Sequence, residues 1–153
     1  MTKRYILNFF LFLLVIFFQI YFGMTVFLSS FLNIALIFLV FTFFHFSLYY
    51  LLFLIFLTSI IFNTLSGFFW GTHLIVLVLC FGTSFLLMKF FEKSYFFSRL
   101  IIGNIIISIY FLSFLILNSI FKIFPFYFII LQQFVLTLIG YVILSFLIEK
   151  LKT

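Results

Sequence analysis

The feature that most constrains this chain is a very long stretch without full charges. No Lys, Arg, Asp or Glu occurs from Tyr5 to Met88. A helix needs only about 20 apolar residues to cross a membrane, so this stretch alone predicts several passes. Charged residues make up 7% of the whole chain, whereas soluble domains contain about 25%. The sequence therefore predicts an integral membrane protein and excludes a soluble globular domain.

Breaks in the apolar pattern predict about six transmembrane helices in an all-α fold, with residues 1–153 forming a single transmembrane domain. The run 31–62 would give a helix of about 48 Å, too long for a hydrocarbon core of about 30 Å and short for two full passes. His45, Phe46 and Ser47 interrupt this run, which predicts a hairpin of two short helices. The expected helices span 5–24, 29–44, 47–62, 72–91, 100–121 and 126–148, with 25–33 as a surface connection.

The distribution of basic residues favours six passes over five. Six passes place both termini and the loop 89–99 on one side of the membrane, together with seven of the eight Lys and Arg residues. Basic residues favour the cytoplasmic side, so we expect a multi-pass protein with both termini in the cytoplasm. Five passes, with 31–62 as one tilted helix, would separate Lys3 and Arg4 from the other basic residues.

The net charge of +6 arises from basic residues at the ends of apolar runs. These residues form no patch with interleaved aromatic side chains, which a nucleic-acid surface would show. The expected partners are therefore the lipid bilayer and other membrane proteins, and nucleic acid is not expected.

Few residues of the chain could carry out chemistry. His45 and His73 are the only histidines, and the expected topology places them on opposite faces of the membrane without nearby partners. A metal site needs three or four suitable ligands, and Cys80 is the only cysteine. Glu92 and Glu149 lie beside lysines and are interpreted as solvated end charges. We therefore expect no catalytic residues, no metal and no cofactor.

The stretch Asn63 to His73, NTLSGFFWGTH, is the densest polar and glycine cluster of the first ninety residues. In a six-pass chain it forms an external turn. Its GxxxG pair favours close helix approach, with a specific contact surface as the alternative. The candidate contact residues are Asn63, Ser66, Gly67, Gly71 and Thr72.

Small and polar residues also mark the fifth and sixth expected helices. Gly103, Tyr110 and Asn118 lie near one stripe of the fifth helix, and Gln132, Gln133 and Thr137 lie on the sixth. Such stripes most often pack on a neighbouring helix, although they can also line a ligand cavity. The candidate helix-packing residues are Gly103, Asn104, Tyr110 and Gly140.

The run Asn63-Thr64-Leu65-Ser66-Gly67, followed by Gly71-Thr72 and a long apolar helix, resembles the D-x-x-S-G…G signature of the MreD family of rod-shape-determining membrane proteins. The likeness spans roughly residues 31–118 and includes the charged loop 89–99. Asn63 stands where the family usually has an acidic residue, and the proline that often opens the second helix is missing before Asn33.

The resemblance implies a non-enzymatic scaffold subunit of the cell-shape and lateral wall-synthesis machinery, located in the bacterial cytoplasmic (inner) membrane. Its expected partners are MreC-like and RodA-like membrane proteins and, indirectly, an MreB-like filament. It also implies a fold similar to the substrate-binding subunits of energy-coupling-factor transporters. A vitamin or small-molecule transporter subunit is therefore the main alternative, and a membrane enzyme is the third.

Overall fold

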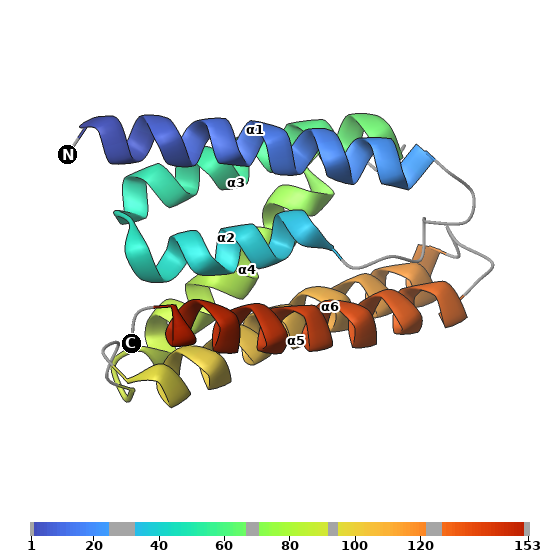
Figure 1. Cartoon of the computed structure of the whole chain (residues 1–153). Helices are drawn as coiled ribbons and strands as arrows, with labels where there is room; N and C mark the ends of the chain where they lie inside the picture. The colour runs from blue at the N-terminus through green and yellow to red at the C-terminus, as the bar shows by residue number, and fades with distance from the viewer. Residues whose placement is uncertain (1, 25–32, 67–70, 92–94, 122–126, 152–153) are drawn as a thin grey trace.

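A computed structural model describes residues 2–24, 33–66, 71–91, 95–121 and 127–151 (Figure 1). These residues form six helices that run alternately in opposite directions, so the N- and C-termini lie at the same end of the bundle. The predicted all-helical architecture and the break near residue 46 are confirmed. The helices are α1 (Thr2–Met24), α2 (Ile34–His45), α3 (Leu48–Ser66), α4 (Thr72–Leu87), α5 (Phe96–Phe121) and α6 (Tyr127–Lys150).

Three of these helices, α1, α5 and α6, are long and apolar enough to cross a membrane by length and composition. The other three are shorter apolar helices, and α2 has only 12 residues. At about 1.5 Å per residue α2 is about 18 Å long, well short of a full span. This combination of helices is that of a polytopic membrane protein.

The charged segment between α4 and α5 begins and ends earlier than the sequence predicts. The N–H of Lys89 binds the carbonyl of Leu86, and the N–H of Phe90 binds that of Leu87. In both bonds the N–H binds the carbonyl three residues earlier, and not four residues earlier as in an α-helix. The α-helix therefore ends at Leu87 and not at residue 91. The next helix starts at Phe96 and not at residue 100, which places Arg99 within its first turn.

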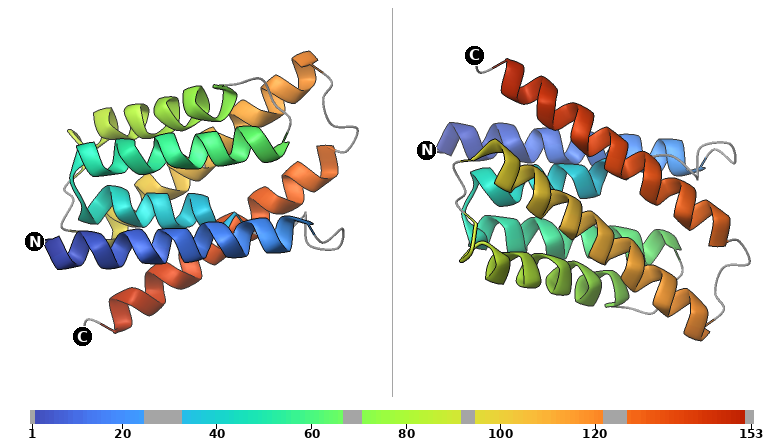
Figure 2. Two further views of the ribbon diagram at one scale, coloured as in Figure 1. Left: turned by 90° about the horizontal axis from the view of Figure 1, so that it is seen from above. Right: turned by 90° about the horizontal axis from the view of Figure 1, so that it is seen from below.

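The six helices form two groups that cross obliquely. Helices α1 to α4 run roughly along one direction, and the α5–α6 pair crosses them at an angle (Figure 2). Helix α2 lies in the centre and contacts α1, α3, α5 and α6. The central position of α2 follows from its sequence, IALIFLVFTFFH, which is apolar on all sides. Its buried residues are Ala35, Leu36, Ile37, Leu39, Val40, Thr42 and Phe43.

The N-terminus of α2 lies inside the bundle. Asn33 is only 5% exposed, and its N–H donates to Oγ1 of Thr137, in the middle of α6, at 2.8 Å. The N–H of Ile34 donates to Oε1 of Gln19 on α1 at 2.8 Å. Asn33 Oδ1 accepts the N–H of Leu36 at 2.9 Å and caps the helix. The surface position expected at Asn33 is therefore wrong; residues 25–32 of that expected connection lie outside the described residues.

Helices α5 and α6 approach closely at Gly103. A Cβ atom at Gly103 would overlap the hydroxyl and ring of Tyr141 on α6. The Tyr141 hydroxyl donates to the backbone carbonyl of Arg99 at 2.8 Å. In a helix this carbonyl also accepts from the residue four positions later, which is Gly103. Glycine at this position therefore leaves the space that the tyrosine hydroxyl occupies.

We predict that Gly103→Ala lowers the free energy of unfolding by about 1–3 kcal/mol, because the new methyl group overpacks the α5–α6 contact. Gly82→Ala on α4 is the matched control, since a Cβ there meets no atom within 4 Å. That control should be neutral or stabilise the helix by up to about 1 kcal/mol. Unfolding of both purified variants in mild detergent measures the difference, and equal stabilities would contradict the prediction.

Candidate functional site

A side-chain hydrogen bond joins α3 to the start of α4 across the stretch that contains the sequence motif. Asn63, near the end of α3, and His73, the second residue of α4, are both buried. Asn63 Oδ1 accepts the backbone N–H of His73 at 3.3 Å and lies 2.8 Å from His73 Nδ1. An amide oxygen only accepts hydrogen bonds, so this geometry places the imidazole proton on Nδ1. The expectation that His73 has no nearby partner is wrong.

The side chain of Asn63, on α3, acts as an N-terminal cap for α4. Gly71 occupies the cap position with φ +93° and has no side chain to accept the first N–H groups. The N–H that cap side chains usually satisfy is that of the second or third helical residue. Asn63 accepts this bond for His73 from the neighbouring helix. The turn 63–73 therefore depends on both the positive φ at Gly71 and the amide at Asn63.

Aromatic side chains enclose the imidazole and link the turn to a third helix. The His73 ring lies 4.9 Å from the Phe114 ring on α5 and 5.7 Å from the Phe62 ring on α3, measured between centroids. Phe114 in turn lies 4.9 Å from Tyr110. Helices α3, α4 and α5 therefore meet around one buried polar pair.

The other candidate contact residues lie around this pair. Thr72 is the first residue of α4 and is half-buried, and Ser66 is the last residue of α3. Gly67 and the side chain of Ser66 lie outside the described residues. A Cβ at Gly71 would meet no atom within 4 Å, so Gly71 serves backbone conformation in this structure. The role of the GxxxG pair as a contact surface stays a prediction.

The candidate helix-packing residues differ in what they contact. Gly103 lies against Tyr141, and the buried Tyr110 interacts with the side chain of Asn33 at the start of α2. Asn104 is half-buried, and its Oδ1 is buried without a hydrogen-bond partner among the described residues. Gly140 is half-buried beside Tyr141 on α6. Their functional role stays a prediction.

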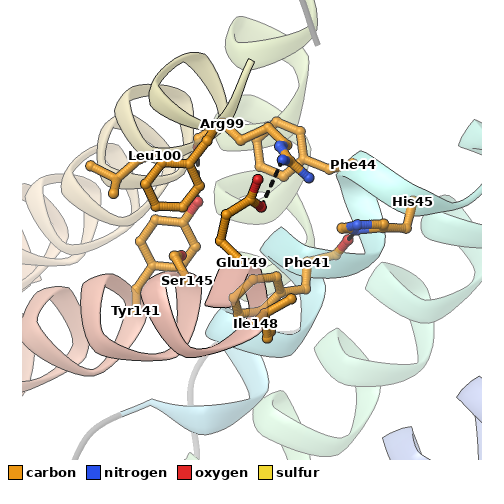
Figure 3. Close-up of a pocket in the computed structure, with 10 residues that line it drawn as sticks. Phe41, Phe44, His45, Arg99, Leu100, Tyr141, Ser145, Ile148 and Glu149 are labelled. Atoms are coloured by element: carbon orange, nitrogen blue, oxygen red, sulfur yellow. Dashed lines mark hydrogen bonds and ion pairs between the residues drawn. The ribbon is translucent and has the colours of Figure 1, made fainter. Parts of the chain in front are cut away.

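An ion pair between α5 and α6 escaped the sequence interpretation. Arg99 Nη2 donates to Glu149 Oε2 at 3.1 Å at the end of the bundle where both termini lie (Figure 3). The Glu149 side chain, expected to be a solvated end charge, is 39% exposed and in addition pairs with Arg99. The signal was available, because Arg99 lies near the start of α5 and Glu149 near the end of α6, which fall at the same end of two antiparallel neighbouring helices. Glu92 lies outside the described residues.

In the described part of the chain, no group of three His, Cys, Asp or Glu side chains lies close enough to hold a metal ion. Cys80 is fully buried in the core, and His45 Nδ1 bonds the Phe41 carbonyl at 2.8 Å at the opposite end of the bundle from His73. His73 bonds Asn63 and so joins α4 to α3.

We predict that Asn63→Leu lowers the free energy of unfolding by about 1–3 kcal/mol, because it removes the oxygen that accepts two buried N–H groups of His73. Thr64→Val is the matched control, since Thr64 is exposed and its hydroxyl bonds the Ile60 carbonyl of its own helix. Combining Asn63→Leu with His73→Phe should restore part of the loss, because it removes the ring N–H that Asn63 accepts. Denaturation of the purified variants in detergent measures these stabilities. An Asn63→Leu protein as stable as the Thr64→Val control would refute the role of Asn63 in joining α3 to α4.

Comparison of the chain with protein-family profiles, curated proteins and solved structures finds no match. The site is therefore built from its geometry alone. The family suggested by Asn63 to Thr72 stays a prediction.

Proposed function

We propose that this chain is a non-enzymatic subunit of the inner-membrane machinery that controls cell shape and lateral wall synthesis, and that it acts through helix-to-helix contacts. The resemblance of residues 63–72 to the MreD signature supports the assignment of the machinery. Among the described residues, buried polar side chains bond one helix to another, and this supports the scaffold role.

The observation that carries the scaffold role is that these polar groups join helices. Asn63 joins α3 to α4 through His73. Asn33 joins α2 to α6 through Thr137. Tyr50 on α3 donates to the Tyr5 carbonyl on α1 at 3.3 Å and to Asn8 Oδ1 at 3.0 Å. A protein whose polar side chains hold its own helices in fixed positions presents a defined outer surface to membrane partners.

One observation favours the alternative, a substrate-binding subunit of a small-molecule transporter. Transporters often bind substrates at discontinuous helices that begin inside the membrane, and α2 begins inside the bundle. The N–H groups of Asn33, Ile34 and Leu36 are already bound by side chains, which leaves them unable to receive a substrate. The pocket between α2, α5 and α6 encloses about 20 Å³, so it admits only part of a ligand and cannot enclose a whole substrate as sites of roughly 300–1,000 Å³ do. The scaffold is therefore the better proposal.

Affinity purification separates the two functions. We expect the tagged full chain, extracted in mild detergent, to recover MreC-like and RodA-like membrane proteins. Recovery of an ATPase pair together with a bound small molecule would replace the scaffold proposal with the transporter.

The turn 63–73 provides a sharper version of this experiment. Asn63→Leu should reduce recovery of the envelope partners by several-fold, because the turn loses its fixed geometry, whereas Thr64→Val should not. The variant must be compared at equal amounts of folded protein, measured by size-exclusion chromatography. Undiminished recovery with Asn63→Leu would remove the turn from the contact surface.

The proposed orientation can be tested by thiol labelling. Cys80 is buried and is first replaced by Ala. Thr64→Cys, on the exposed side near the end of α3, should then react with an impermeant reagent added to whole cells. Lys89→Cys, at the opposite end of the bundle, should react only after permeabilisation. The reverse pattern would invert the proposed topology.

A further inference from the structure

A small pocket lies between α2, α5 and α6 at the end of the bundle that holds both termini (Figure 3). It encloses about 20 Å³ and is open at its mouth. Its walls are mostly apolar, with Phe41 and Phe44 from α2 on one side. The residues of its lining that carry polar groups are His45, Arg99, Tyr141, Ser145 and Glu149. Figure 3 shows the Arg99–Glu149 ion pair, with Ser145 beside Tyr141 on the same helix as Glu149.

Two buried polar atoms of this pocket have no partner within the described part of the chain. One is Arg99 Nε and the other is the hydroxyl oxygen of Ser145, whose residue is only 7% exposed. The Ser145 hydroxyl lies near that of Tyr141 without the geometry of a hydrogen bond. A buried polar atom without a partner is unfavourable, so two at one cavity indicate a ligand that supplies an acceptor.

Ser145 differs from the other buried hydroxyl residues of the helices. A helical serine or threonine normally satisfies its hydroxyl at a carbonyl three or four residues earlier. Ser145 makes no such bond, so its hydroxyl is available to the pocket. The residues that do make this bond are Thr42, Thr58, Ser59, Ser84 and Thr137.

The charges at the pocket are of both signs. Arg99 and Glu149 form their ion pair through one guanidinium nitrogen and one carboxylate oxygen. The Arg99 side chain is 19% exposed and that of Glu149 is 39% exposed, so the carboxylate faces the mouth. An anionic ligand would satisfy Arg99 but would meet Glu149 as a like charge. A ligand with a phosphate and an adjacent ammonium group matches both charges.

We propose that this pocket binds the headgroup of a phospholipid that carries a primary ammonium group. One phosphate oxygen enters the enclosed space and accepts hydrogen bonds from Arg99 Nε and the Ser145 hydroxyl. The ammonium group donates to the Glu149 carboxylate at the mouth. Arginine suits the phosphate because its planar fork offers several donors at once.

The position of the pocket fits a lipid better than a soluble ligand. It lies among the helix ends that carry Lys3, Arg4, Lys89 and Lys150, the level at which headgroups meet a membrane protein. Phe146 and Leu147, next to the pocket on α6, are more than half exposed. Acyl chains can therefore cover apolar surface on α6 while the headgroup occupies the pocket.

The test is a titration of the purified full chain in mild detergent with dioleoyl phosphatidylethanolamine, phosphatidylcholine and phosphatidylglycerol. Native mass spectrometry counts bound lipid, and the unfolding midpoint is the second readout. We expect phosphatidylethanolamine to bind about tenfold more tightly than the other two, because each lacks an ammonium that can donate to Glu149. Soluble O-phosphoethanolamine should raise the unfolding midpoint far less than the lipid does. An equal rise with O-phosphoethanolamine would show that the pocket does not select a lipid.

Variants of the pocket give the decisive comparison. Ser145→Ala should weaken phosphatidylethanolamine binding by several-fold, and its matched control is Ser84→Ala, a buried serine outside the pocket. Glu149→Gln should remove the preference for phosphatidylethanolamine over phosphatidylglycerol. The ammonium group then has no carboxylate to bind, and the anionic phosphatidylglycerol no longer meets a negative charge. Arg99→Gln should weaken binding of every phosphate-bearing lipid, with Lys89→Gln as its control.

Three results would overturn the proposal. These are equal binding of the three lipids to the unaltered chain, tightest binding of phosphatidylglycerol to it, and a lipid preference that Glu149→Gln leaves unchanged. If Arg99→Gln does not fold because it leaves a carboxylate unpaired, the Ser145 and Glu149 variants decide alone.

Discussion

The need to satisfy backbone polar groups away from water governs the arrangement of this protein. Helix α2 is too short to cross a membrane and begins inside the bundle, where no water is at hand to bind its first N–H groups. Side chains from α1, from α6 and from Asn33 itself accept these bonds. Because α2 also packs against four other helices, its position fixes the centre of the bundle.

The same solution recurs where other helices meet. Asn63 accepts the backbone N–H of His73 across the α3–α4 turn, and the Tyr141 hydroxyl donates to the Arg99 carbonyl between α6 and α5. In each case a side chain of one helix bonds the backbone near the start of another. In a lipid environment helices associate through close packing and through hydrogen bonds between helices, so these directional bonds act together with packing to align the helices.

Asn63 shows what an amide provides at a buried contact between two helices. Its oxygen accepts two hydrogen bonds from His73, as a carboxylate oxygen also could. The residue is 6% exposed and lies among aromatic rings, where a carboxylate would need a charged partner. The amide therefore retains the hydrogen bonds of the turn and avoids placing a charge in the bundle.

The sequence by itself determined the fold class, the six helices and the interruption after His45. These features follow from hydrophobic runs and their breaks, because the free energy of moving a segment from water into lipid depends on the residues of that segment alone. It also singled out Asn63, Gly71 and Gly103. Only the tertiary structure decided that Asn33 is buried against Thr137, that Asn63 binds His73, and that Arg99 pairs with Glu149. These partners lie 104, 10 and 50 residues apart in the chain, and which of them meet depends on how the helices pack and not on local hydrophobicity.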